Sequence, residues 1–374
     1  MKHTFCCKPS KNKAAKKSVF NLKKQIMTNT KTSKIIMFCF SLLWSLSSFV
    51  NLDAQSSKTV SAKAYNDAVK AVNLGKNEEA LSLLDKSINA NSQFDMAYIL
   101  RGKYYLAVGN KEQALKDFNQ AIAINSGLGE GYACLAYYYL GEKQPQLAFD
   151  NSNKAIFLNY KTANVYYYRA QARLQNADYS NAIADFTNAI DMNRLQPDFY
   201  HDRAIAKLQL NDFVGAESDL KKALEMNSKS LIYNNTYVFI LVKQKEYNQA
   251  LTFLSDLIEK NSDNSDLILK RADIKMLLGD VKGAETDYRN LVEKTASPLV
   301  WTSLGNSLLK QVKYKEAIDC FEKAIQADVK FAEAYLSRGI ALENLGDTEG
   351  ACSDWKTAAE LGDNQANIFL TDCK

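Results

Sequence analysis

Residues Asp95–Leu128, DMAYILRGKYYLAVGNKEQALKDFNQAIAINSGL, contain two short amphipathic patterns of helical period with a turn between them. Tyr98 and Gly102 fall on one face of the first pattern, and Ala114 and Phe118 fall on one face of the second. A Gly-Asn pair at positions 109–110 supplies the turn. Since two helices of this length cannot bury their apolar faces alone, the stretch predicts neighbours of the same kind.

The same unit recurs along the chain with a period of 34 residues, shortened once to 33. One column of small residues runs through Ala80, Ala114, Ala148, Ala182, Ala216, Ala250, Ala284, Ala317 and Ala351. A second small column runs through Ala68, Gly102, Ala136, Ala170, Ala204, Val238, Ala272, Gly305 and Gly339. An aromatic column lies four residues before the second, at Tyr98, Tyr132, Tyr166, Tyr200, Trp301 and Tyr335. The small columns predict the points at which helix backbones approach most closely.

This pattern resembles the tetratricopeptide repeat, a helix-turn-helix unit of 34 residues. The resemblance implies an all-α, right-handed α-solenoid of about nine repeats with a short C-terminal capping helix. The expected repeats are 61–94, 95–128, 129–162, 163–196, 197–230, 231–264, 265–297, 298–331 and 332–364, with a linker over 55–60 and a cap over 365–374. A third small column runs through Ala121, Ala155, Ala189, Ala223, Ala324 and Ala358. Val238 departs from the second column, and Leu257 and Leu291 depart from the third, so the sixth and seventh repeats are the least regular.

Residues 1–54 form a basic leader that differs from the repeats. The segment 35–50, IIMFCFSLLWSLSSFV, is shorter than the about 20 apolar residues of a membrane span. Lysines precede this segment, and Leu52-Asp53-Ala54 follows it as a cleavage site of the small-residue type. The segment therefore predicts a cleaved signal peptide and export to the periplasm, the cell surface or the medium. Met27 is an alternative start. An uncleaved segment 35–50 that anchors the chain in a membrane is the alternative.

The positive charge of the chain belongs to this leader. Residues 1–54 hold ten of the 47 Lys and Arg residues and one of the 42 acidic residues, so the remainder carries about −4. A negative repeat array argues against a nucleic-acid partner. Cys134, Cys320 and Cys352 are expected to pack as small apolar residues. In an exported chain, a Cys352–Cys373 disulfide is the alternative.

A charged pair recurs in five of the repeats, sixteen residues apart. The arginines are Arg101, Arg169, Arg203, Arg271 and Arg338, and their aspartates are Asp117, Asp185, Asp219, Asp287 and Asp354. Repeats without the arginine also lack the aspartate, which indicates a structural ion pair inside each hairpin.

Signals for catalysis or for a cofactor are missing from the repeats. His201 is the single histidine after the leader, so neither a histidine triad nor a multi-histidine metal site can be assembled. The sequence also has no phosphate-binding glycine loop of the common types. We therefore expect no catalytic, cofactor-binding or metal-binding residues.

In the family, the second, fifth, ninth and twelfth positions of each first helix face a concave groove. The resemblance therefore implies a partner-binding groove that includes Tyr65, Ile99, Lys103, Tyr137, Tyr167, Gln171, His201, Asn235, Phe239, Asp273 and Asn306. Tyr137 and Tyr167 are its main aromatic candidates, and packing against the next helix is their alternative role. No fifth position holds the lysine that family members use to clamp the acidic C-terminus of cytosolic chaperones.

The sequence thus predicts an exported scaffold or adaptor that binds a protein or an extended peptide. The alternatives are an accessory module of an enzyme complex and a membrane-anchored assembly scaffold. The identity of the partner does not follow from the sequence.

Overall fold

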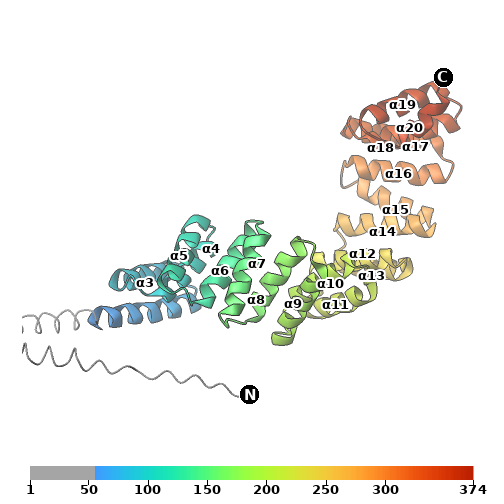
Figure 1. Cartoon of the computed structure of the whole chain (residues 1–374). Coiled ribbons are helices and arrows are strands. Elements are labelled where there is room, and N and C mark those ends of the chain that lie inside the picture. The colour runs from blue at the N-terminus through green and yellow to red at the C-terminus, as the bar shows by residue number, and fades with distance from the viewer. Residues whose placement is uncertain (1–54, 374) are drawn as a thin grey trace, which may run out of the picture. The chain divides into compact units, whose positions relative to one another are not determined.

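A computed structural model of the protein describes residues 55–373, and these contain helices and turns but no strand (Figure 1). The predicted leader, its segment 35–50, the alternative start at Met27 and the expected cleavage site lie outside the described residues. Within the described range, none of the helices combines the length and the hydrophobicity that a transmembrane span requires. The expected all-α fold of repeated helix pairs is confirmed.

The chain forms two compact units, and the first ends at Lys161. It begins with a helix over residues 55–73 and continues with α3 (Asn77–Ala90), α4 (Asp95–Ala107), α5 (Lys111–Ile124), α6 (Gly129–Gly141) and α7 (Pro145–Phe157). Residues 55–60, expected as a linker, are instead part of the first helix. They contain no proline or glycine that would end it.

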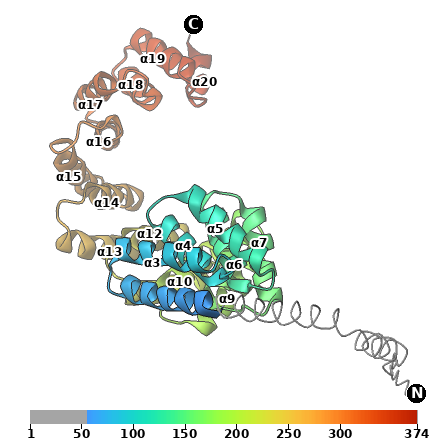
Figure 2. The same ribbon diagram turned by 90° about the vertical axis from the view of Figure 1, so that its left-hand side faces the viewer.

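The second unit begins at Thr162. Its helices are α8 (Ala163–Gln175), α9 (Tyr179–Met192), α10 (Pro197–Gln209), α11 (Phe213–Met226), α12 (Leu231–Lys243), α13 (Tyr247–Lys260), α14 (Ser265–Leu278), α15 (Val281–Val292), α16 (Pro298–Lys310), α17 (Tyr314–Ala327), α18 (Ala332–Asn344), α19 (Thr348–Glu360) and α20 (Ala366–Phe369), followed by the 3-10 turn η1 (Leu370–Asp372). Successive helices pack in pairs, and α14 to α20 can be followed separately in Figure 2. Pro197 and Pro298 occupy first helical turns, where the missing amide donor costs nothing.

The turn inside every hairpin places one residue in the left-handed conformation. The φ angles lie between 56° and 88° at Gly75, Gly109, Lys143, Ala177, Asn211, Lys245, Gly279, Val312 and Gly346. Four of these positions hold the glycine that such a φ favours. Asn211 also tolerates this conformation, but Lys143, Ala177, Lys245 and Val312 disfavour it, so the stacking of the helices imposes the turn there. The β-branched Val312 is the least compatible of them.

The small residue of each first helix is followed, sixteen positions later, by a residue of the second helix that it faces in the hairpin. A Cβ atom on Gly305 would lie 2.4 Å from Phe321 Cε1, and one on Gly102 would lie 2.6 Å from Phe118 Cε1. An alanine at these two positions would therefore require the ring to shift, whereas Ala170 and Ala272 precede the buried rings of Phe186 and Tyr288 by the same sixteen residues.

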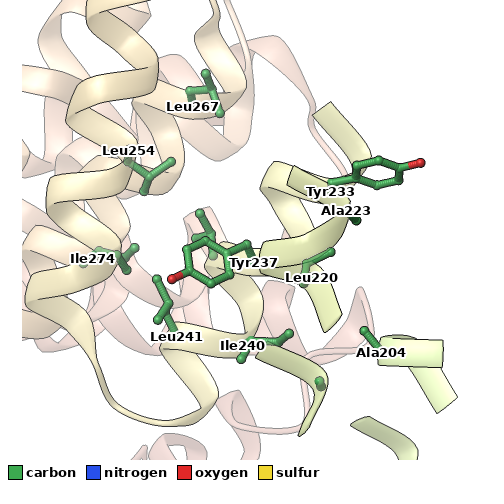
Figure 3. Packing of buried hydrophobic residues seen from close by; sticks show 13 residues of the cluster. Ala204, Leu220, Ala223, Tyr233, Tyr237, Ile240, Leu241, Leu254, Leu267 and Ile274 are labelled. Carbon is green, nitrogen blue, oxygen red and sulfur yellow. The ribbon is translucent and has the colours of Figure 1, made fainter. Parts of the chain in front are cut away.

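The sixth repeat solves the same packing problem with different residues. Val238 replaces the small residue, and Leu254 replaces the ring in the cluster that joins α10 to α14 (Figure 3). Both side chains are almost completely buried, as is Leu241. The departures of this repeat are thus complementary, and its core remains filled.

A short segment covers the last hairpin. Cys352 of α19 forms a disulfide with Cys373, and Phe369 of α20 stacks on Trp355 with ring centroids 5.0 Å apart. The alternative of a Cys352–Cys373 disulfide is therefore realised, and Cys352 is not a simple packing residue. Four helical residues cannot hold a helix alone, so the cap depends on this stack and this covalent link.

Candidate functional site

The recurrent arginines and aspartates meet inside their hairpins. Arg101 donates from Nε and Nη2 to the two carboxylate oxygens of Asp117, at 2.8 and 2.7 Å. The same two-pronged contact, with distances between 2.6 and 2.8 Å, joins the other pairs, Arg169–Asp185, Arg203–Asp219, Arg271–Asp287 and Arg338–Asp354. Each aspartate is buried, so the arginine neutralises a charge that would otherwise be costly inside the protein.

Three of these carboxylates receive a second cation from the next turn of the first helix. Lys207 lies 2.8 Å from Asp219, and Lys275 lies 2.8 Å from Asp287. Arg173 plays the same part for Asp185. Because these charges pair with one another, they belong to the framework of the hairpins and are not free to bind a ligand.

The sixth and eighth repeats fill the place of the ion pair with apolar or neutral groups. In the sixth repeat, Tyr237 and Phe253 replace the pair, with ring centroids 4.8 Å apart. In the eighth repeat, Leu304 and Cys320 replace it, and both are buried. Burial raises the pKa of Cys320 to about 11, so its thiol stays protonated and unreactive.

Tyr167 and His201 belong to a polar network across α8, α10 and α12. The Tyr167 hydroxyl donates to Asp202 Oδ2 at 2.7 Å, and His201 Nδ1 lies 2.9 Å from Asp202 Oδ1. His201 Nε2 lies 3.2 Å from Thr236 Oγ1, and Gln171 donates to Asp202 Oδ2 at 3.1 Å. Burial, reinforced by the Asp202 carboxylate, raises the pKa of Tyr167.

This network links α8, α10 and α12. Thr236 donates its hydroxyl proton to the carbonyl of Ile232 at 2.9 Å. The ring of Tyr167 packs against Phe199 at 4.7 Å between centroids. Tyr167 thus makes the packing contact expected for its alternative role, and both Tyr167 and His201 are half-buried.

A pocket of about 470 Å³ lies beside this network, on α10 and α12. Its walls include Ile205, Leu208, Asn235, Thr236, Phe239 and Lys243. The Phe239 side chain is 48% exposed, unlike the buried apolar residues that precede and follow it on α12. Asn235 and Phe239 were predicted groove residues, so the structure brings two members of that set to one surface depression.

The predicted groove residues of the first unit are distributed differently. Ile99 is only 1% exposed and lies in the core of α4, so its assignment to a groove surface is wrong. Tyr65 packs its ring edge against Phe94 at 5.1 Å. Lys103 is exposed and bonds Glu130, while Tyr137 is 53% exposed. Tyr137 is thus the accessible aromatic residue of the predicted set in this unit.

The last two predicted residues lie on α14 and α16. Asp273 accepts a hydrogen bond from the hydroxyl of Tyr288 at 2.7 Å, and burial raises the pKa of its carboxyl. Asn306 is half-buried. No group of three or more metal-ligating side chains occurs among residues 55–373.

The sequence-based set omitted Lys243, Leu208 and Thr236, which line the pocket. Leu208 stands at a twelfth position, which the family pattern includes. Lys243 stands one position further, at the C-terminal turn of α12, and a search restricted to the four groove positions could not have found it.

Comparisons with known proteins agree with this architecture. Sequence profiles described as tetratricopeptide repeat match residues 97–127, 167–230 and 298–331. No curated protein matches the sequence.

The chain is similar to several solved structures. A tetratricopeptide repeat protein from Parabacteroides merdae is 18% identical with a TM-score of 0.43, over 74% of this chain and 97% of that one. PilW, described as a widely conserved type IV pilus biogenesis factor, is 14% identical with a TM-score of 0.44, over 62% and 92%. YrrB, described as a protein with an unusual peptide-binding site, is 20% identical with a TM-score of 0.40, over 50% and 97%.

Three features agree on one family. They are the 34-residue period, the paired helices that begin at Asp95, Gly129, Ala163, Pro197, Leu231, Ser265, Pro298 and Ala332, and the three matching sequence profiles. The chain belongs to the tetratricopeptide repeat family.

Proposed function

We propose that the protein is a scaffold that binds another protein or an extended peptide, and that the pocket on α10 and α12 is a docking point. The tetratricopeptide repeat fold is typical of protein–protein interaction modules. The observation that carries the proposal is the exposed ring of Phe239 inside this pocket. Large apolar side chains in concave sites are the usual anchors of a bound segment.

The ion pairs and the polar network contribute only Thr236 to the residues that line this pocket. They are satisfied within the repeats, and replacing them would change folding together with binding. The pocket residues differ, because Phe239 and Lys243 are exposed and can be altered without opening the core. They are therefore the right positions for a test of function.

Site-specific crosslinking tests the proposal. A photoreactive phenylalanine at Phe239 should crosslink a discrete set of partner peptides, identified by mass spectrometry. The matched control carries the same group at Val329, which is 64% exposed on the turn between α17 and α18. Identical crosslinks from both positions, or none from Phe239, would contradict docking at this pocket.

We further propose that the scaffold acts in an exported compartment. The apolar segment 35–50 behind a lysine-rich flank supports this location, and so does the Cys352–Cys373 disulfide, since such bonds persist in oxidising compartments. Mass spectrometry of the mature N-terminus tests it, with a new terminus near Gln55 as the expected result. An intact peptide over residues 35–50 in the membrane fraction would instead favour the membrane-anchored scaffold.

A further inference from the structure

The pocket on α10 and α12 carries one charged side chain, Lys243, among the residues that line it. No salt bridge forms at Lys243 within the part of the chain that the structure describes. Its ammonium group lies 5.3 Å from the centre of the Phe239 ring, over an apolar wall. Because Lys243 is exposed, its ammonium group is accessible to a carboxylate on a bound segment.

The nearby acidic groups already have partners. Asp266, whose carboxylate lies 3.5 Å from the Asn235 amide, forms an ion pair with Lys270. Asp202 accepts hydrogen bonds from Tyr167 and Gln171 and contacts His201. Asp212, between the lining residues Asn211 and Phe213, accepts a hydrogen bond from the Gly215 amide. The charged side chain that itself lines the pocket is Lys243.

The rest of the pocket is suited to an apolar side chain. Ile205 and Leu208 of α10 face the space beside Phe239 of α12, and Asn235 adds an amide at the wall. Burying one aliphatic or aromatic side chain here is worth about 1.5–3 kcal/mol. A neighbouring carboxylate on the same segment would reach Lys243 and fix the direction of the chain.

From these contacts we infer that the pocket binds an extended peptide segment in which an acidic residue, Asp or Glu, stands beside a Leu, Ile or Phe side chain. This inference rests on the proposed function and specifies the partner of the same site. A basic segment would meet Lys243 with like charge. A polyanion such as a nucleic acid finds a single cation among the residues that line this pocket.

Peptide display tests this specificity. A library of random twelve-residue peptides is selected on the immobilised full chain, and the enriched sequences are compared with those selected on Lys243→Glu. We expect Asp or Glu beside Leu, Ile or Phe on the native chain, and Lys or Arg in place of the acid on Lys243→Glu. The matched control is Lys310→Glu, an exposed lysine at the same position of the eighth repeat, which should leave the selection unchanged.

Affinities measured on one enriched peptide complete the test. Lys243→Glu should weaken binding about tenfold, the size of a charge-assisted hydrogen bond, and exchanging the acid of the peptide for lysine should restore most of it. Binding that depends on Phe239 but ignores both charge reversals would overturn the inference and leave the proposed function intact. Selection that enriches no peptide, with no crosslinks at Phe239, would overturn both.

Discussion

Replacing Arg338 by leucine tests the role of the ion pairs most directly. The two nitrogens of Arg338 bond both oxygens of Asp354, and no second cation reaches that carboxylate among the described residues. Leucine keeps much of the apolar stem and removes the charge. The Asp354 carboxylate, which is 6% exposed, is then left without a counter-ion inside the last hairpin.

The expected loss in the free energy of unfolding depends on whether another cation remains beside the aspartate. Breaking a buried pair on one side costs about 3–5 kcal/mol, and partial exposure of the arginine places Arg338→Leu near the lower end, at about 3 kcal/mol. Arg203→Leu should cost less, about 1–2 kcal/mol, because Lys207 still neutralises Asp219 at 2.8 Å.

A double substitution separates charge burial from packing. Arg338→Leu combined with Asp354→Leu should recover most of the loss and come within about 1 kcal/mol of the native chain. Leucine is already present at the arginine position in the eighth repeat, as Leu304, and at the aspartate position in the first, as Leu83.

Urea titrations followed by far-UV circular dichroism, with hydrogen exchange read separately for α18 and α19, provide the assay. Exchange is included because repeat arrays unfold in stages. A double variant as unstable as Arg338→Leu alone would refute the reasoning, since the loss would then come from packing. Equal losses for Arg203→Leu and Arg338→Leu would refute the role of the second cation.

Three further predictions concern the cap, a turn and a carboxylate. Cys352→Ser should release the segment after residue 365, because a disulfide that closes a loop with a sequence separation of 21 stabilises the fold by about 3 kcal/mol. Amide hydrogen exchange in that segment should then become fast, and reducing the Cys352–Cys373 disulfide of the native chain should have the same effect. Val312→Gly should raise the free energy of unfolding by about 1 kcal/mol because φ is 64° there, and an unchanged urea midpoint would contradict that. For Glu285, burial raises the pKa, but hydrogen bonds from neighbouring amide and cationic groups outweigh it and lower the pKa from 4.5 to about 2. The contribution of Glu285 is therefore complete above pH 4.5 and lost as the pH falls toward 2, so Glu285→Gln should flatten the stability profile in that window.

The fold could be predicted because the same packing pattern recurs from one repeat to the next. Small residues at a fixed period can be read from a single sequence, and so can the glycines of four turns. The other turns could not, since Lys143 and Val312 have no intrinsic preference for the left-handed conformation. There the stacked helices impose the backbone, which is a tertiary effect.

The candidate site could be predicted only in part. Position within the repeat selected Phe239 and Asn235, which both line the pocket, but it also selected Ile99, whose side chain fills the core. Whether a given position is exposed depends on the size of its neighbours in the adjacent repeats. The absence of a salt bridge at Lys243 among the described residues could not be predicted either, because it depends on which carboxylates lie nearby in space.

The uneven distribution of ion pairs makes the array respond unequally to heat and cold. Hairpins such as α8–α9 and α18–α19 contain the pair, whereas α12–α13 and α16–α17 rely on apolar contacts at the same place. Dehydrating a charge becomes less costly as temperature rises, while hydrophobic contacts weaken on cooling. On cooling, the apolar hairpins therefore lose stability relative to the ion-paired ones, and on warming the ion-paired hairpins gain relative stability. The temperature dependence of stability thus differs from one repeat to the next.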